Sequence, residues 1–133
     1  MSHKKAKEIR RLERMKAWKI NLKEYNFTGR VRDEGGNIVT RTLPYDVKES
    51  LALILFNQDL KLSIDESFRS KDLADKIRAS ENGSIIVDSA EMAKIKQAYN
   101  IVKGPGEHEL EFFRRIKDAE EVEMEEVKEK KAK

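Results

Sequence analysis

The sequence predicts an α+β fold in which a β-hairpin at about residues 25–43 is packed by three to four helices. Two observations favour this class. Residues 25–32 and 38–43 alternate apolar and polar side chains on either side of an Asp-Glu-Gly-Gly-Asn segment, and glycine supplies the positive φ that a short hairpin connection needs. Later segments repeat apolar residues at intervals of three and four, which is the spacing of amphipathic helices.

A basic helix and a short strand are predicted before the hairpin. Residues 4–17 are rich in residue types that favour helices, and Ile9, Leu12 and Met15 recur every three residues as a thin apolar seam. Residues 18–22 then alternate apolar and polar side chains, which indicates a strand. Because the seam is too sparse to hold a helix on its own core, we expect this helix to need a partner or to fray.

Helices and an extended connector are predicted directly after the hairpin. Pro44 is expected to end the second strand, and Asp46 with Glu49 has the spacing of a capping box for an almost entirely apolar helix. Residues 60–64 alternate in the manner of a short strand or an extended connector. Ser70 is then expected to cap a brief helix.

The last third of the chain predicts a strand and two helices. Residues 84–88 form a short apolar strand, and Asp88 with Glu91 repeats the capping-box spacing at the start of the next helix. A Gly-Pro-Gly sequence ends that helix. A final acidic helix is predicted from about Glu107, and it loses its apolar face after about Met124.

One hydrophobic core is predicted over residues 18–122, between a basic helical arm at 1–17 and a charged tail at 123–133 that we expect to fray. A chain of 133 residues has the commonest size of a single domain. The predicted core comprises Phe27, Val31, Val39, Leu43, Leu51, Ile54, Leu55, Leu62, Ile77, Ile86, Met92, Ile95, Tyr99, Phe113 and Ile116.

The composition excludes several classes of function. The chain has no cysteine, which rules out disulfide scaffolds, thiolate zinc sites, iron-sulfur clusters and cysteine nucleophiles. The longest apolar run, residues 51–56, is far shorter than the roughly 20 residues that cross a bilayer, so we expect no membrane contact. No apolar stretch typical of a secretory signal follows Met1, so a cytoplasmic location is expected.

Signatures of catalysis and of cofactor binding are sparse. The two histidines are His3 and His108, and His108 has Glu107 and Glu111 nearby but no second histidine to complete a metal site. Neither of the glycine-rich motifs that bind phosphate groups occurs. We therefore predict a protein that is not an enzyme and that holds no cofactor and no metal.

Charge is distributed unevenly along the chain. Residues 1–23 carry nine Lys or Arg against two Glu, whereas residues 107–126 carry nine Asp or Glu against three Lys or Arg. This asymmetry has three physical interpretations: the basic segment meets a polyanion, the two segments meet each other, or they pair between copies. The sequence leaves all three open.

The leading hypothesis is a non-enzymatic protein-binding module, a structural, assembly or regulatory accessory protein that docks through its charged helical ends. Its partner is another protein or a second copy, because helices with dense charge and little apolar surface suit docking on a surface of opposite charge. The candidate residues are Ile9, Arg10, Arg11, Leu12, Arg14 and Met15 near one end, and Glu120, Glu121 and Glu123 near the other.

The alternative is a small nucleic-acid-binding regulatory protein. A basic arm that neutralised about five phosphates would give a log–log salt slope near −4.5, and arginines on the hairpin would add a β-ribbon surface. The candidate residues are Lys4, Lys5, Lys7, Arg10, Arg11, Arg14, Arg30, Arg32 and Arg41.

In its size, its charged ends and its absence of cysteine, the chain resembles the short accessory proteins that bacteriophages encode. This resemblance rests on composition, and no motif carries it. It implies a virion-associated location in place of a purely cytoplasmic one.

Overall fold

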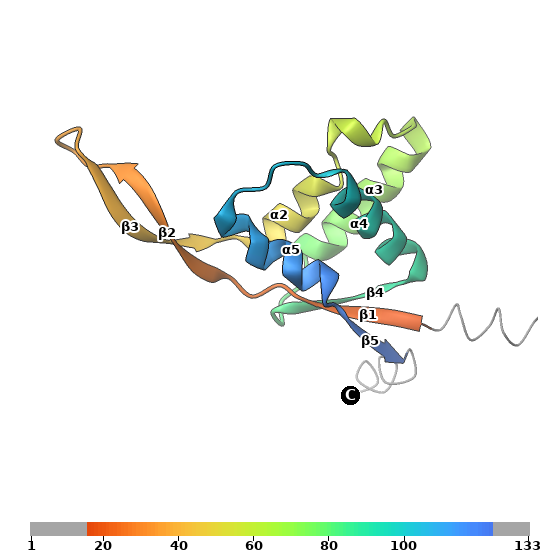
Figure 1. Ribbon diagram of the computed structural model, residues 1–133. Coiled ribbons are helices and arrows are strands. Elements are labelled where there is room, and N and C mark those ends of the chain that lie inside the picture. The colour runs from red at the N-terminus through yellow and green to blue at the C-terminus, as the bar shows by residue number, and fades with distance from the viewer. Residues whose placement is uncertain (1–15, 124–133) are drawn as a thin grey trace, which may run out of the picture.

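The computed structural model describes residues 16–123, and Figure 1 shows a helical body from which a hairpin extends. The predicted α+β class is confirmed, since these residues form four α-helices and two antiparallel sheets of three and two strands. In chain order the elements are β1 (Lys16–Asn21), β2 (Tyr25–Arg32), β3 (Ile38–Tyr45), α2 (Val47–Ile54), the 3₁₀ helix η1 (Gln58–Leu60), α3 (Ile64–Arg78), β4 (Ser84–Asp88), α4 (Ser89–Ile101), the 3₁₀ helix η2 (Glu107–Glu109), α5 (Leu110–Lys117) and β5 (Glu120–Glu123).

β1 is the central strand of the three-stranded sheet, with β4 on one side and β5 on the other. Trp18 lies opposite Val87, and Ile20 lies opposite Ile85. Because directly opposite residues of an antiparallel pair point to the same face, these four side chains form the apolar face that meets the helices. The predicted strands around residues 18–22 and 84–88 are therefore both present, and they are neighbours.

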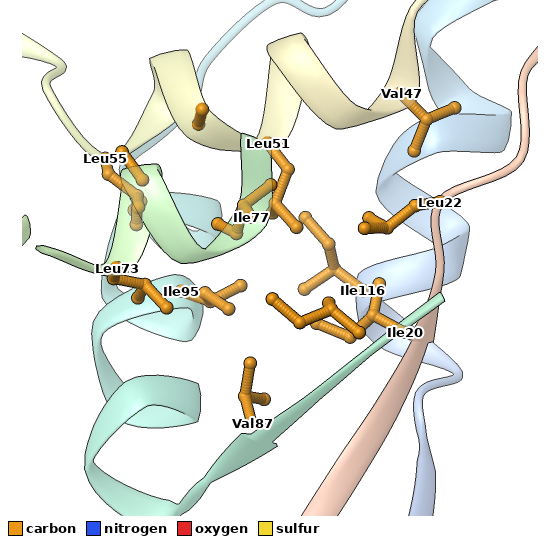
Figure 2. Packing of buried hydrophobic residues seen from close by; sticks show 14 of the residues in the cluster. Ile20, Leu22, Val47, Leu51, Leu55, Leu73, Ile77, Val87, Ile95 and Ile116 are labelled. Carbon is orange, nitrogen blue, oxygen red and sulfur yellow. The ribbon is translucent and has the colours of Figure 1, made fainter. Parts of the chain in front are cut away.

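The hydrophobic core lies between this sheet and the four α-helices. Figure 2 shows Leu51, Ile77, Ile95 and Ile116, one from each helix, in a single cluster with Ile20 of β1. All five side chains are almost completely buried. Of the helical positions predicted for the core, Leu51, Leu55, Ile77, Met92, Ile95, Phe113 and Ile116 are buried, and Ile54 and Tyr99 are partly buried against the cluster.

Side-chain caps fix the starts of α3 and α4. The Asp88 carboxylate accepts a hydrogen bond from the Glu91 backbone N–H at 2.8 Å, and the Glu91 carboxylate accepts one from the Asp88 N–H at 2.9 Å, which confirms the predicted capping box. α3 begins with a similar reciprocal pair, Ser63 and Glu66. Ser70 does not cap a helix as predicted, because it is buried within α3.

β2 and β3 form the predicted hairpin around a turn at residues 33–37, in which Gly36 has a φ of 81°. Pro44 lies within β3 and does not end it. The expected packing of the hairpin by the helices is found at its root, where Tyr25 and Tyr45 lie against the core. The helices cover the β4–β1–β5 sheet, and the outer part of the hairpin extends away from them (Figure 1). The predicted core positions that lie outside the core are therefore Phe27, Val31, Val39 and Leu43 on the hairpin, together with Leu62 and Ile86, all of them half-buried.

The predicted charged helices at the two ends are not confirmed over residues 16–123, although η2 and α5 form the first part of the final helix predicted from about Glu107. Residues 1–15 and 124–133 lie outside the described residues, and Lys16 and Ala17 belong to β1. At the other end, α5 stops at Lys117, and residues 120–123 form a strand beside β1. The acidic helix is therefore wrong over these positions, because pairing with β1 satisfies their backbone groups in a sheet.

Candidate functional site

An aromatic cluster holds the root of the hairpin on the helical body. The rings of Tyr25 and Tyr45 stack with their centroids 4.9 Å apart, and the ring of Phe27 stacks on His108 at 4.7 Å. Phe112, a buried residue of α5, lies 5.8 Å from the Tyr45 ring. Aromatic ring pairs stabilise a structure by more than the burial of their surface area alone. These contacts therefore fix the point at which the hairpin leaves the body.

Polar contacts reinforce this root. The Tyr25 hydroxyl donates a hydrogen bond to the backbone carbonyl of His108 at 2.6 Å, and the Arg115 guanidinium lies 5.2 Å from the centroid of the Tyr25 ring. Arg115 also donates a hydrogen bond to the Lys23 carbonyl oxygen, at the start of the hairpin. Burial raises the pKa of Tyr25 and of Tyr45 above the usual value of 10.0, so both hydroxyls are neutral at physiological pH.

From the root outward, one face of the hairpin is apolar. The register places Phe27 opposite Leu43 and Val31 opposite Val39, so these four side chains share a face. All four are half-buried, and none of them packs against the core cluster. We call them the hairpin's apolar face.

Gly29 and Arg41 lie opposite each other between the two apolar pairs. A Cβ atom added at Gly29 would lie 3.1 Å from Leu43 Cδ1 and 3.2 Å from Phe27 Cε2, so these two side chains close over the glycine. Arg41 is exposed and is the charged residue on this face of β2 and β3. It would therefore lie at the centre of any contact made by the apolar face.

The opposite face of the hairpin carries mostly polar and basic side chains, with the exposed Ile38 among them. Arg30 lies opposite Thr40, and Arg32 lies opposite Ile38. The structure therefore brings two of the predicted nucleic-acid-binding arginines onto one face and leaves Arg41 on the other. The remaining candidates of that set, Lys4, Lys5, Lys7, Arg10, Arg11 and Arg14, lie outside the described residues.

Glu120, Glu121 and Glu123 lie on β5, beside the basic strand β1. Glu120 is opposite Lys19 and Glu123 is opposite Lys16, while the Lys16 ammonium lies 4.0 Å from the Glu121 carboxylate. For this part of the chain, the basic and acidic segments therefore lie side by side within one molecule. Exposed ion pairs of this kind contribute little stability. The other predicted protein-binding residues, Ile9, Arg10, Arg11, Leu12, Arg14 and Met15, lie outside the described residues.

The described residues offer little that points to catalysis, to metal binding or to a membrane-spanning helix. A cavity of about 520 Å³ between β1 and α5 is lined by Lys19, Lys23 and Arg114 together with Asp118 and Glu120, so charges of both signs lie side by side. Its lining residues include no histidine and no cysteine. Among residues 16–123, no group of three or more His, Asp or Glu is placed to hold a metal ion, and no helix is long and apolar enough to span a membrane.

No protein-family model, no curated protein and no solved structure matches the chain. The functional argument therefore depends on the surfaces of the chain itself. Among these, the hairpin combines a fixed root with an apolar face that extends beyond the core cluster.

The predicted binding sites do not include the hairpin's apolar face, because the alternation predicts its four residues to belong to the core. Alternation shows which side chains share a face, but it does not show what covers that face. A signal in the sequence does point to the other sheet: Ile85 and Val87, with Trp18 and Ile20, offer the helices a second apolar strand pair. Two apolar sheets and one set of helices imply that one sheet stays uncovered.

Proposed function

We propose that this chain is a non-enzymatic protein-binding module, a structural, assembly or regulatory accessory protein, and that it docks through its hairpin. The supporting observation is the hairpin's apolar face: Phe27 stacks on His108 at the root, whereas the rest of the face extends away from the body and lies outside the core cluster. A two-stranded hairpin is only marginally stable alone in water, and contiguous exposed apolar surface marks interaction sites. A partner that covers this face would both bury it and stabilise the hairpin.

This docking surface differs from the charged ends that the sequence favours. Lys16 and Lys19 lie next to glutamates of β5 in the sheet, so part of the opposite charge is compensated within the chain. The hairpin carries no such compensation along its strands. Its apolar face therefore supports protein binding better than the described part of the charged ends does.

Site-specific photo-cross-linking tests the proposal. Val39 on the apolar face is replaced by a photoreactive phenylalanine derivative in the full chain, and the neighbouring Thr40 on the opposite face is replaced in a matched control. After irradiation in the cells that produce the protein, we expect discrete protein adducts from position 39 and few from position 40. Mass spectrometry identifies the adducts. Equal labelling at both positions, or no protein adduct at either, would contradict docking through this face.

The alternative, nucleic-acid binding, draws support from Arg30 and Arg32, which share a face of the strands that has no acidic residue. Asp33 and Glu34 in the turn oppose it, because they would repel phosphates at the hairpin tip. Titration with random duplex DNA, single-stranded DNA and RNA separates the two functions. Micromolar affinity with a steep salt dependence would favour the alternative, and no binding at about 100 mM salt would argue against it.

A further inference from the structure

Another apolar region, which is exposed, lies at the end of the helical body where α2 stops and α3 begins. Glu49 in the first turn of α2 pairs with Arg78 in the last turn of α3 at 2.9 Å, so the two helices are antiparallel. The end of α2 and the start of α3 therefore lie at the same end of the helix pair. Four large apolar side chains of this region, which we call the helix-end patch, are exposed: Leu53 (57%), Phe56 (40%), Ile64 (76%) and Phe68 (65%).

The two residues of this patch on α3 face away from the core. Ile64 and Phe68 are four residues apart, so they lie one above the other on one side of the helix. The buried side chains of α3, including Leu73 and Ile77, lie on its other side. Single exposed apolar residues are ordinary, but four from one region form a surface that another molecule can cover.

The helix-end patch and the hairpin lie at opposite ends of the molecule. Figure 1 shows the hairpin tip at one extreme and the η1 region, which joins α2 to α3, at the other. The aromatic cluster fixes the hairpin root, so the hairpin cannot fold across the body to cover the patch of its own chain. The two surfaces can meet only between two copies.

The charges of the two surfaces are complementary. Around the patch, residues 57–69 carry Asp59, Asp65 and Glu66 against Lys61 and Arg69, so a small net negative charge remains. A surface of this sign attracts a basic element and gives the contact a defined orientation.

The strands of the hairpin carry the opposite sign. Arg30, Arg32 and Arg41 lie on β2 and β3, which have no acidic residue, and the acidic pair Asp33 and Glu34 is confined to the turn. Arg41 lies between the two apolar pairs, so it would reach the acidic rim of the patch while its neighbours bury their apolar surface.

We infer that the hairpin's apolar face docks on the helix-end patch of a second copy of this chain, so that the protein self-associates head to tail. This inference rests on the proposed protein-binding function and names its partner. Each contact uses the hairpin of one copy and the patch of the next, which leaves one hairpin and one patch free. Such a contact closes into a ring or continues as a filament, depending on the rotation between copies.

Two variants of the full chain test the contact, one for each surface. Val31→Asp with Val39→Asp places charge on the hairpin's apolar face, and Ile64→Asp with Phe68→Asp does the same on the patch. Light scattering after size-exclusion chromatography gives the mass across a series of micromolar concentrations. We expect the wild-type chain to form species larger than a dimer and each variant to be monomeric. Circular dichroism checks that every variant folds.

A matched control separates loss of the contact from damage to the hairpin. Thr28→Asp with Thr42→Asp introduces the same two charges at directly opposite positions on the other face of the hairpin. This control should assemble like the wild type. If it is also monomeric, the apolar face is not the contact, and the inference fails.

Mixing the two monomeric variants gives the sharpest test. The hairpin variant keeps an intact patch, and the patch variant keeps an intact hairpin, so one contact can form and assembly must stop there. We expect a mass of two chains with one of each variant. A mixture that stays monomeric, or a variant that still assembles alone, would overturn head-to-tail docking.

The experiments can reject self-association without rejecting the proposed protein-binding function. A wild-type chain that is monomeric throughout overturns the inference. If cross-linking from position 39 then captures a different protein, the protein-binding function stands without self-association. If position 39 instead gives no protein adduct and the wild-type chain binds nucleic acid with a steep salt dependence, both the inference and the protein-binding function are overturned.

Discussion

Burial divides apolar residues of the same kind into two groups in this chain. Ile95 of α4 is completely buried in the core cluster, whereas Val39 of β3 is half-buried on the hairpin and touches no part of that cluster. The cost of truncating a side chain depends on how much of it is packed, because the loss combines the transfer of the removed atoms with the cavity left behind. The two residues should therefore respond very differently to substitution.

We predict that Ile95→Ala lowers the free energy of unfolding by about 2–5 kcal/mol, the range found for such truncations in packed cores. Val39→Ala should lower it by less than about 1 kcal/mol, because the site is not part of a packed interior. Urea denaturation of dilute protein measures both. An equally large loss at Val39 would show that the hairpin belongs to the core after all.

The tyrosines at the hairpin root predict a loss of stability in alkali. Burial raises the pKa of Tyr25 and Tyr45 in the folded chain above 10.0, so the unfolded chain ionises first as the pH rises. Their contribution to stability is therefore complete below pH 10.0 and is lost as the pH rises through the folded pKa values.

The matched variant is Tyr25→Phe with Tyr45→Phe. We predict that its free energy of unfolding falls less than that of the wild type between neutral pH and pH values above 10.0. At neutral pH it should be less stable than the wild type by about 1 kcal/mol, because the hydrogen bond from Tyr25 to the His108 carbonyl is lost. Parallel alkaline losses in the two proteins would show that these hydroxyls do not cause the pH dependence.

At the scale of elements, the hairpin and the body differ in what holds them. β1 has strands on both sides and helices over one face, whereas β2 and β3 have each other and the contacts at their root. Backbone hydrogen bonds in a strand pair without further packing open locally at a low free-energy cost. The hairpin should therefore be the less stable element in a monomer.

Hydrogen exchange measured by mass spectrometry tests this difference. In dilute solution, we predict that backbone amides in the outer part of the hairpin, residues 28–42, exchange faster than those of β1. Raising the protein concentration should slow exchange in the hairpin and leave β1 unchanged, because docking covers only the former. Equal exchange in both elements at low concentration would contradict this account.

Local chemistry predicted some elements and not others. The capping box at Asp88 and Glu91 and the turn glycines of the hairpin specify their structures within a few residues, so both were predictable. The alternation of residues 60–64 predicts a short strand or an extended connector, but the cap at Ser63 starts α3 there and leaves Ile64 exposed. β5 is a short acidic strand whose conformation comes from pairing with β1, a contact between distant segments that no local pattern reveals.

The same limit applies to the candidate site. The sequence places Arg30, Arg32 and Arg41 on a hairpin, as observed, but only the register shows that Arg41 shares the face of Val31 and Val39. The shared face that the alternation predicts is confirmed by the register. Its assignment to the core is wrong, because which of the two sheets packs against the helices depends on the whole fold.

At the scale of the whole molecule, the surfaces available for contact are separated in space. The hairpin extends from one end, and the helix-end patch lies at the other (Figure 1). Lys16 and Glu123, the outermost described residues of the chain, are opposite each other in the sheet, so both terminal segments begin from adjacent strands. This separation lets one molecule use its hairpin and its patch at the same time, which head-to-tail assembly requires.

Charge reversal across the contact tests this assembly in the intact molecule. Arg41→Glu places a like charge against the acidic rim of the patch, so we predict a shift toward monomer at a given concentration. Adding Asp59→Lys and Asp65→Lys to the same chain reverses the rim as well and should restore assembly, because every copy carries both surfaces. Sedimentation velocity measures the three proteins, and their melting temperatures control for the loss of the favourable Asp65 at the start of α3. If the triple variant stays monomeric while folded, Arg41 does not face this rim, and the opposite charges of the two surfaces do not direct their contact.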